Sequence, residues 1–431
     1  MALKVAAVPG DRRFSRGESP ALGMIAKSVD RQRAGNPQKA PDSDRAGRYQ
    51  LQRVAANLIY RPLPEGQKQE RVCTCHRWRT VGTVQVRVDH ARNKAIFSGL
   101  ESCSNVWACP ICSGIITEER RHDLQAAIDA WAKQGGEVYL MTLTLPHIRA
   151  DNLSALIALA SEASKRFKQS KTFRAVMEQA GRIGNVRATE CTWGSWHGWH
   201  PHYHELIFAK KDQLPLLDQL RAAWVAALLK SGAADAAQLN DINLHSFDVR
   251  GGDFAAEYVA KFGHEASFKS KLEAGATWGA AREMVKGQSK VAHTMRGSTP
   301  FTLLVHAERG DDQAAALFRE FYWAFKGRRQ LTWSPGLRAR LGVGEEKADE
   351  EITAQQQSAP EFETVATLQR EDWALVLRHK ARYQVLLWAE REGAAGVHGV
   401  LLALRQIERE RPPDRGRHDQ DEEDAIDAQT C

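Results

Sequence analysis

The sequence predicts an α+β fold in which a central, mostly antiparallel β-sheet is flanked by helices and preceded by a small cysteine-containing module. Three observations predict it. Between residues 137 and 263 the strand and helix patterns alternate in the order β, α, β, β, α, β, α, which is typical of α+β domains. Two of these strand patterns are joined by the short stretch GSWHGW (194–199), which indicates a hairpin. Five of the seven cysteines fall within forty residues upstream of this region.

The individual elements follow from periodicity and from breaker residues. Alternation over 80–89 predicts a half-buried strand, and apolar residues at three- and four-residue intervals predict a helix over 117–134 that Gly135 and Gly136 end. A β-branched, apolar run ended by Pro146 predicts a buried strand over 137–146. The same reasoning gives a helix over 152–179 broken near Lys171, strands over 185–193 and 202–208, a helix over 214–230, a strand and turn over 241–252, a helix over 254–262 and a last helix over 372–391.

The composition divides the 431 residues into five parts. We expect a basic, largely disordered arm over 1–70, a cysteine module over 71–115, the α+β domain over 116–265, a basic accessory region over 266–345 and an acidic C-terminal tail with one or two helices over 346–431.

The net charge of +7 favours a polyanionic partner, although a soluble basic protein without such a partner has the same composition. Apolar stretches are shorter than the roughly 18 residues that span a bilayer, and the first residues lack a signal-peptide pattern. We therefore expect a cytoplasmic protein without a membrane partner.

The most informative motif is HPHYHELIF, residues 200–208. Alternate residues of a strand share a face, so His202 and His204 should point the same way, about 7 Å apart along the chain. His200 has the same parity, but Pro201 leaves its direction open. Glu190, on the other strand of the predicted hairpin, could add an oxygen ligand. Two imidazoles and a carboxylate suit a divalent ion with open positions, whereas the alternative is a set of hydrogen-bonded surface histidines.

The helix over 254–262 carries Tyr258 and Lys261, which are three residues apart and share a face. A phenol with a pKa near 10 is a weak nucleophile, but a nearby metal ion and a lysine that favours the phenolate would activate it. The alternative is a packing tyrosine. Tyr203, between the histidines, should point to the opposite face of the strand.

The cysteines form a second candidate site. Cys109-Pro-Ile-Cys112 has the Cys-x-x-Cys spacing of one half of a zinc-knuckle site, and Cys103 lies six residues before it. The fourth thiolate comes from Cys73 or Cys75. Four soft ligands suit a tetrahedral structural Zn²⁺. A redox pair is the less favoured alternative, because no thioredoxin-like βαβ frame surrounds the motif.

Two further pairs are candidates for DNA binding. Trp196 and Trp199 flank the histidine motif, where they could stack on unpaired bases or simply pack the hairpin. Arg328 and Arg329 belong to the basic stretch GRRQLTWSPGL (327–337).

Taken together, TLTLP (142–146), HPHYHELIF and EYVAKF (257–262) resemble, in order and spacing, the three motifs of the HUH endonucleases, and specifically the rolling-circle replication initiator (Rep) proteins of small plasmids. The resemblance covers about 71–265. It implies an HUH-type domain and a metal-dependent, site-specific single-strand DNA endonuclease and strand transferase. His202 and His204 match the metal ligands, with Mg²⁺ or Mn²⁺ as the ion, Tyr258 matches the nicking tyrosine, and Lys261 matches the lysine that follows it.

The resemblance further implies a 5′-phosphotyrosyl intermediate, a free 3′-OH primer, recognition of double-stranded origin DNA before single-stranded cleavage, and a host helicase as partner. Phe262 stands where two-tyrosine initiators have their second tyrosine, so the chain looks like the one-tyrosine type. Phe254 stands where some initiators have a terminating glutamate, which leaves that role open between Asp253, Glu257 and another residue. The alternatives are a zinc-containing DNA-binding regulator without nuclease activity, or an HUH transposase.

Overall fold

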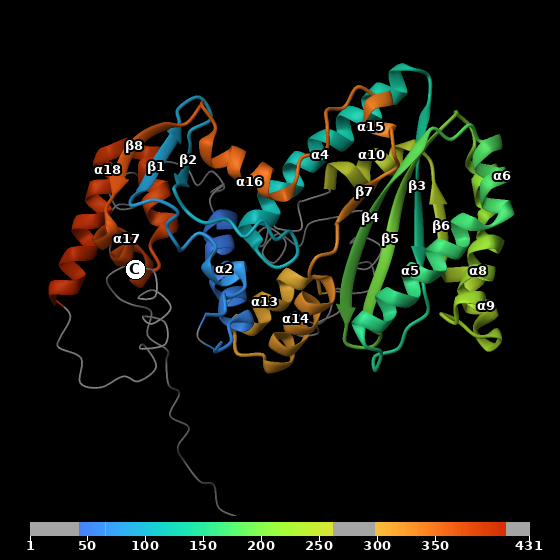
Figure 1. The fold of residues 1–431 in the computed structure, drawn as a ribbon, viewed down its shortest axis with the longest axis horizontal. Coiled ribbons are helices and arrows are strands. Elements are labelled where there is room, and N and C mark those ends of the chain that lie inside the picture. Colours follow the sequence, from blue (N-terminus) through green and yellow to red (C-terminus); the bar gives the residue numbers. More distant parts are fainter. Residues whose placement is uncertain (1–42, 65, 262–297, 411–431) are drawn as a thin grey trace, which may run out of the picture.

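The computed structural model describes residues 43–64, 66–261 and 298–410 (Figure 1). Its strands form one five-stranded and one three-stranded sheet, and every pairing is antiparallel. Helices flank both sheets (Figure 1). The expected α+β class with antiparallel sheets and flanking helices is therefore confirmed.

The five-stranded sheet has the order β6-β3-β5-β4-β7. The strands are β3 (Glu137–Thr144), β4 (Gly184–Gly194), β5 (Gly198–Ala209), β6 (Phe247–Arg250) and β7 (Leu331–Trp333). The hairpin expected from GSWHGW is formed by β4 and β5, which pair from Gly184↔Phe208 to Gly194↔Gly198. Gly198 has a φ of 75°, and a Cβ there would approach Arg149 Cα to 2.7 Å, so this turn requires glycine.

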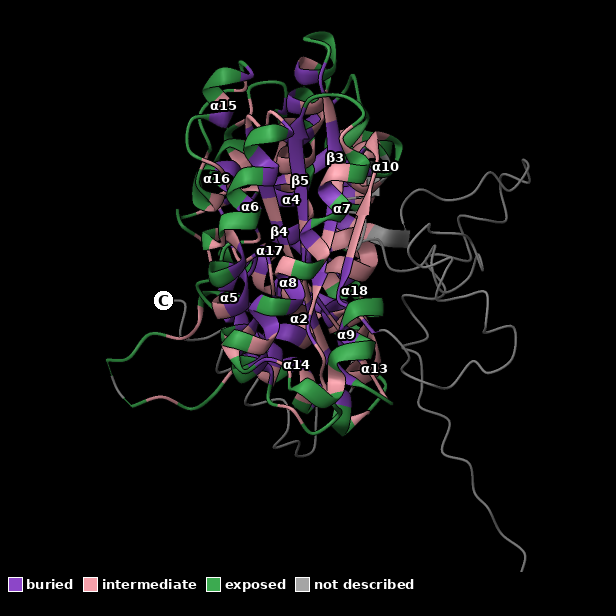
Figure 2. Ribbon diagram, turned by 90° about the vertical axis from the view of Figure 1, so that its right-hand side faces the viewer, coloured by how far each residue is buried: buried purple, intermediate pink, exposed green. Residues whose placement is uncertain are grey.

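The two faces of this sheet pack against different helices. Tyr139, Tyr203 and Ile207 point to the face that shares a core with α5 (Leu153–Gln169) and α8 (Leu220–Ser231). Val138 and Phe208 point to the other face and pack on α4 (Pro110–Lys133) and α10 (Gly252–Lys261). Figure 2 shows the central strands buried between these helices.

Further helices complete this part of the fold. They are α6 (Lys171–Gln179), α7 (Leu214–Asp218), a 3₁₀ helix (Ala236–Gln238), α9 (Leu239–His245), α13 (Pro300–Glu308), α14 (Asp312–Phe325) and α15 (Leu337–Arg340). The break expected near Lys171 lies at Ser170, whose hydroxyl accepts the backbone N–H of Phe173 and caps α6.

The three-stranded sheet joins distant parts of the chain. Strands β1 (Val84–Asp89) and β2 (Lys94–Ser98) form a hairpin, and β8 (Glu363–Leu368) pairs with β1. Helices α17 (Arg370–Arg378) and α18 (Arg382–Glu410) cover this sheet and share a separate hydrophobic core with it. In Figure 1 this unit lies at the opposite end of the molecule from the five-stranded sheet.

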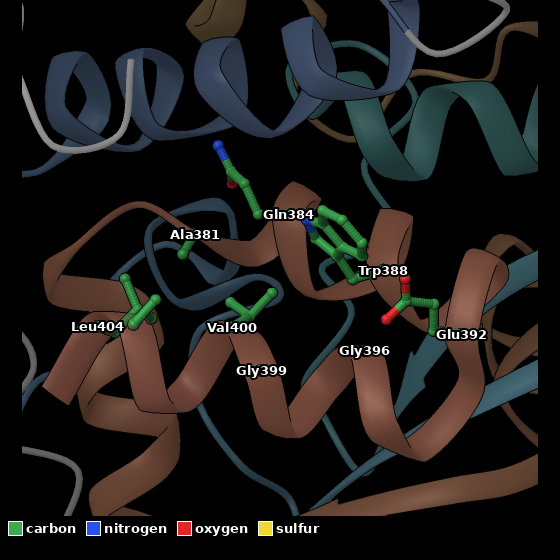
Figure 3. Close-up of a pocket in the computed structure, with 9 residues that line it drawn as sticks. Ala381, Gln384, Trp388, Glu392, Gly396, Gly399, Val400 and Leu404 are labelled. Carbon is green, nitrogen blue, oxygen red and sulfur yellow. The ribbon is translucent and has the colours of Figure 1, made fainter. Parts of the chain in front are cut away.

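Helix α18 is bent into two arms at Gly393, whose backbone is non-helical (φ 59°, ψ −134°). The arms pack so closely that a Cβ on Gly396 would meet Trp388 O at 2.2 Å. A hollow of about 170 Å³ lies between them, lined by Gln384, Trp388, Val400 and neighbouring residues (Figure 3). Its lining is mainly apolar and includes none of the histidines, cysteines or tyrosine singled out in the sequence.

Several sequence expectations differ from the structure. The helix expected over 372–391 is divided into α17 and the start of α18. Part of the expected disordered arm forms α2 (Ser43–Ile59), in which Leu51, Ala55 and Ile59 recur at four-residue intervals and are buried on one face of the helix. Residues 346–410 are not a tail but fold as α16 (Asp349–Ser358), β8, α17 and α18. Within 241–252, the first residues continue helix α9 and only Phe247–Arg250 is a strand.

The cysteine module is likewise not a separate unit, since β1 and β2 pair with a strand from the C-terminal region, a long-range contact that local periodicity does not encode. None of the helices in the described part of the chain is long and apolar enough to cross a membrane.

Candidate functional site

Strand register brings the predicted acidic and histidine ligands onto one face of the five-stranded sheet. His202 of β5 lies opposite Glu190 of β4, and His204 is two residues further along β5 on the same face. On the other side of β5, Thr144 pairs with His202 and Thr142 with His204. The three expected ligands therefore come from the rigid middle of a sheet rather than from loops.

The same face changes character along its length. At one end, Val138, Val186 and Phe208 pack beneath α4. At the other end the apolar residues give way to His202, His204 and Glu190, which are only partly buried. Helix α10, which crosses this face beside β3, places Tyr258 over them.

The side chains converge on the Glu190 carboxylate. His202 Nε2 lies 3.5 Å and His204 Nε2 lies 3.6 Å from Glu190 Oε2. The Tyr258 hydroxyl donates a 2.6 Å hydrogen bond to Glu190 Oε1, and its ring centroid lies 4.8 Å from that of His204. One potential ligand atom of each of Glu190, His202 and His204 lies within 4.8 Å of the others, so the three could hold one metal ion.

Both imidazoles are oriented by contacts at Nδ1. His204 Nδ1 lies 3.0 Å from Thr142 Oγ1, and His202 Nδ1 lies 3.2 Å from the carbonyl oxygen of His200. A protonated Nδ1 that donates to these oxygens leaves Nε2 of each ring free to bind a metal. Thr142, which lies in the TLTLP motif, contacts a candidate ligand and is not among the residues singled out in the sequence.

The electrostatics of the group fit a cation site. Burial raises the pKa of Glu190, but His204, His202 and the Tyr258 hydroxyl outweigh it and lower this pKa to about 2. Burial lowers the pKa of His204 to about 4, against the opposing effect of Glu190. At neutral pH the carboxylate is therefore charged and His204 is neutral, which are the protonation states that bind metals.

His200, whose direction the sequence left open, is not part of the ligand group. Its ring lies 5.0 Å from that of His202 and 4.8 Å from that of His147, measured between centroids. Burial, with the charge of His202 next, lowers its pKa to about 3. His200 contributes its backbone carbonyl instead.

Tyr203 points away from the metal ligands, as strand parity requires. Its hydroxyl lies 3.2 Å from Ser161 Oγ on α5, and the Arg187 guanidinium lies 4.8 Å from its ring centroid. Tyr203 is thus on the opposite face of the sheet from His202, His204 and Tyr258.

The structure describes the remaining predicted residues to different extents. Lys261 is the last residue of α10, and its side chain, like that of Glu257, lies outside the described residues; Phe262 lies there entirely. Asp253, in the first turn of α10, is exposed. Arg328 and Arg329 are both exposed just after α14.

The two tryptophans behave in opposite ways. Trp196 is 69% exposed in the β4-β5 turn, so its ring is accessible. Trp199 is buried, stacks on Phe321 and donates a 2.9 Å hydrogen bond to Glu320. The expectation that Trp199 stacks on DNA bases is wrong, because its side chain is buried in the hydrophobic core.

Four of the five clustered cysteines converge on one point at the N-terminus of α4. Cys75 Sγ lies 3.7 Å from Cys109 Sγ and 3.5 Å from Cys112 Sγ, and Cys103 Sγ lies 3.7 Å from Cys112 Sγ. Sulfurs at the corners of a tetrahedron around Zn²⁺, with bonds of about 2.3 Å, lie about 3.8 Å apart. Disulfide sulfurs would lie at about 2.05 Å. The spacing therefore fits a shared metal ion, and the choice left open between Cys73 and Cys75 falls on Cys75.

Cys73 faces another way and contacts Ala56 O through its sulfur at 3.5 Å. Burial, assisted by Glu70, raises its pKa to about 12, so it stays a thiol.

Backbone donors already support negative charge in the cluster. Cys103 N–H points to Cys75 Sγ at 3.2 Å, and Asn105 N–H points to Cys103 Sγ at 3.4 Å. Burial raises the pKa of Cys75 and Cys103 well above the usual value, whereas hydrogen bonds from the neighbouring thiols outweigh burial at Cys109 and lower its pKa. A cation would replace the protons that burial otherwise retains.

Comparison with known proteins finds similarity in the central part of the chain. Residues 98–226 match a protein family described as Replication protein. A segment of 67 residues is 36% identical to a Protein rep of Streptomyces lividans, and 67 residues are 39% identical to a neomycin resistance protein of Streptomyces cyanogenus. Each alignment covers 16% of this chain and 15% of the relative, so the chain is matched to a small part of either protein. No solved structure shows a significant match. The family match includes Glu190, His202 and His204 and ends before Tyr258.

Proposed function

We propose that the protein is a plasmid rolling-circle replication initiator of the one-tyrosine HUH type, which cuts one strand of its origin and joins it again. The match of residues 98–226 to a replication-protein family and the name of the Streptomyces lividans relative support the replication role. The observation that carries the nicking chemistry is the 2.6 Å contact between the Tyr258 hydroxyl and Glu190, within the same group as His202 and His204.

In the proposed reaction, Tyr258 Oη attacks the scissile phosphorus, the bond from phosphorus to the 3′-oxygen breaks, and the 5′-phosphate stays on the tyrosine. The phenol gives up one proton and the leaving 3′-oxygen takes one up, which yields the 3′-OH primer. A Glu190 carboxylate with a pKa of about 2 is too weak a base to retain the phenol proton, so its role toward Tyr258 is to orient Oη. Lys261, one turn later, is proposed to favour the phenolate.

His202, His204 and Glu190 would hold Mg²⁺ or Mn²⁺. Such an ion, when bound, polarises phosphate oxygens and stabilises the charge that develops during displacement. Thr142 and the His200 carbonyl keep the two imidazoles oriented for it.

The DNA path is proposed from exposure and charge. Trp196, at the tip of the hairpin that carries the ligands, would stack on an unpaired base of the cleaved strand. Arg328 and Arg329 would contact backbone phosphates of the origin duplex. A host helicase would extend the opened region, and termination is assigned to no single residue among Asp253, Glu257 and others.

The cysteine cluster is proposed to hold one structural Zn²⁺ through Cys75, Cys103, Cys109 and Cys112. Because Cys109 and Cys112 belong to the start of α4, this ion would anchor the helix that covers the apolar end of the catalytic face. Elemental analysis of protein purified without added metal should find one zinc per chain, and its absence would remove this part of the proposal.

The nicking proposal is tested with purified protein, Mn²⁺ and single-stranded oligonucleotides from the cognate origin. Wild-type protein should cut one strand, and His202→Ala and His204→Ala should each abolish cutting while circular dichroism stays unchanged. Cleavage by the double variant at the wild-type rate would show that the metal site is misassigned. Origin binding without cleavage under any metal would instead favour a DNA-binding regulator.

A further inference from the structure

We infer that Arg382, at the start of helix α18, supplies the buried positive charge that balances a metal-tetrathiolate at the cysteine cluster. The C-terminal helices would then be part of the metal site, although they are more than 230 residues away in sequence from its last cysteine, Cys112. The inference rests on the proposed binding of a divalent ion by Cys75, Cys103, Cys109 and Cys112, and it is independent of the nicking chemistry.

Among the residues that the structure describes, Arg382 is a buried cation without an acidic partner. Its residue is 6% exposed, and its guanidinium donates to three neutral oxygens: His76 O at 3.0 Å, Gln52 Oε1 at 3.0 Å and Tyr49 O at 3.2 Å. No ion pair joins Arg382 to any carboxylate in the described part of the chain. A buried charge that is hydrogen-bonded but not balanced is costly, so a counter-charge is expected nearby.

The cysteine cluster adjoins Arg382 and would be anionic with a divalent ion bound. The carbonyl that accepts from Arg382 Nη1 belongs to His76, the residue directly after Cys75. Gln52, which accepts from Arg382 Nη2, in turn donates to Cys75 O at 2.9 Å. Four thiolates around a divalent ion carry a net charge of −2, and this charge would act at short range through a protein interior of low polarity.

Arg77 adds further positive charge beside Arg382. Burial lowers the pKa of Arg382 to about 10; Tyr49 opposes this shift, Arg77 adds to it, and Cys75 opposes it. Arg77 is itself 8% exposed, so the surroundings of the cluster hold more than one buried guanidinium. A doubly negative cluster would offset this positive charge.

The C-terminal helices also hold the two loops that present Cys75 and Cys103. Trp373 Nε1 on α17 donates to Arg77 O at 2.7 Å, and Thr353 Oγ1 on α16 lies 2.9 Å from Ser104 Oγ. The residues that follow Cys75 and Cys103, which are His76 and Ser104, both have a φ of 53°, a left-handed conformation that is unfavourable without support. Contacts from α16, α17 and α18 thus maintain the backbone geometry that directs two of the four sulfurs.

Two variants distinguish a role of Arg382 in charge compensation from a role in hydrogen bonding. Arg382→Lys keeps the positive charge but loses the forked set of donors, whereas Arg382→Gln keeps a hydrogen-bond donor and loses the charge. Arg391→Gln, an exposed arginine on the same helix, is the matched control. Zinc affinity is measured for each full-length variant by competition with a chromogenic chelator, together with the melting temperature before and after metal removal.

We expect one zinc per wild-type chain. Arg382→Lys and Arg391→Gln should bind zinc within about threefold of the wild-type affinity. Arg382→Gln should lose about 10- to 100-fold in zinc affinity, the range seen when groups that support metal ligands are removed. Metal removal should also lower the melting temperature of Arg382→Gln less than that of wild type.

The charge-compensating role of Arg382 would also be supported if Arg382→Gln failed to fold while Arg382→Lys folded and bound zinc. Equal affinity losses in the Lys and Gln variants, or failure of both to fold, would overturn the inference, because geometry rather than charge would then be essential. A wild-type chain without metal would remove the cluster proposal and this inference together, and would leave the nicking proposal intact.

Discussion

Replacement of Thr142 by Val tests whether the TLTLP strand takes part in metal binding. Valine has nearly the shape of threonine and favours strands, so the change removes one hydroxyl and little else. That hydroxyl lies 3.0 Å from His204 Nδ1. Without it, the ring loses the contact that fixes its tautomer and directs Nε2 toward Glu190.

The expected magnitude follows from the role of the contact. Loss of a hydrogen bond that orients a metal-bound histidine weakens metal affinity by about 10- to 100-fold. This range corresponds to about 1.4 to 2.8 kcal/mol of binding free energy. Because only 16% of the His204 side chain is exposed, we expect that water does not fully replace the missing hydroxyl oxygen.

The assay is titration with Mn²⁺, followed by electron paramagnetic resonance of the free ion. Thr142→Ser retains the hydroxyl and should bind Mn²⁺ within about threefold of wild type. Thr144→Val is the matched control, since Thr144 lies two residues away on the same strand and face but its hydroxyl donates to His245 O. If Thr142→Val bound Mn²⁺ as tightly as Thr144→Val, the proposed orientation of His204 would be refuted.

Three further predictions concern stability and the nicking rate. Tyr203→Phe should lower the free energy of unfolding by about 1 kcal/mol, because only the contact with Ser161 is lost, and should leave nicking at the wild-type rate; a nicking defect would contradict the assignment of faces. Trp199→Ala should destabilise the fold by about 3 to 5 kcal/mol in urea titration, and a near-neutral effect would contradict its burial. Hydrogen bonds led by Lys326 outweigh burial and lower the pKa of Glu70 below 4.5, so its stabilising contribution is present at neutral pH and is lost as the pH falls through the lowered value. Glu70→Gln should therefore be less stable than wild type at pH 7, and denaturant titrations should show the difference shrinking below about pH 4.5; a constant difference would refute this.

The candidate active site was predictable because its residues obey local rules. Strand parity alone put His202 and His204 on one face and Tyr203 on the other, and the short turn between β4 and β5 set Glu190 opposite His202. The supporting contacts were not predictable in the same way. Thr142 reaches His204 only because β3 pairs with β5 in one particular register, which local patterns do not determine.

The parts of the fold that the sequence did not reveal depend on contacts between distant segments. Strand β8 is a partner of β1 across more than 250 residues. Helix α2 was missed for another reason: Leu51, Ala55 and Ile59 have helical spacing but lie in a stretch rich in arginine and other polar residues. Trp199 was ambiguous for a related reason: an aromatic residue in a short turn suits stacking and packing equally, and only the position of Glu320 and Phe321 decides between them.

The central claim is that Tyr258, held against Glu190 and the two histidines, becomes covalently linked to DNA. The most direct measurement is peptide mapping of the adduct trapped when the protein cuts a single-stranded origin oligonucleotide in Mn²⁺. The account predicts a 5′-phosphotyrosyl bond on Tyr258, and no adduct from a Tyr258→Phe protein that still binds the origin. DNA attached to any other tyrosine, or an unchanged adduct from Tyr258→Phe, would contradict it.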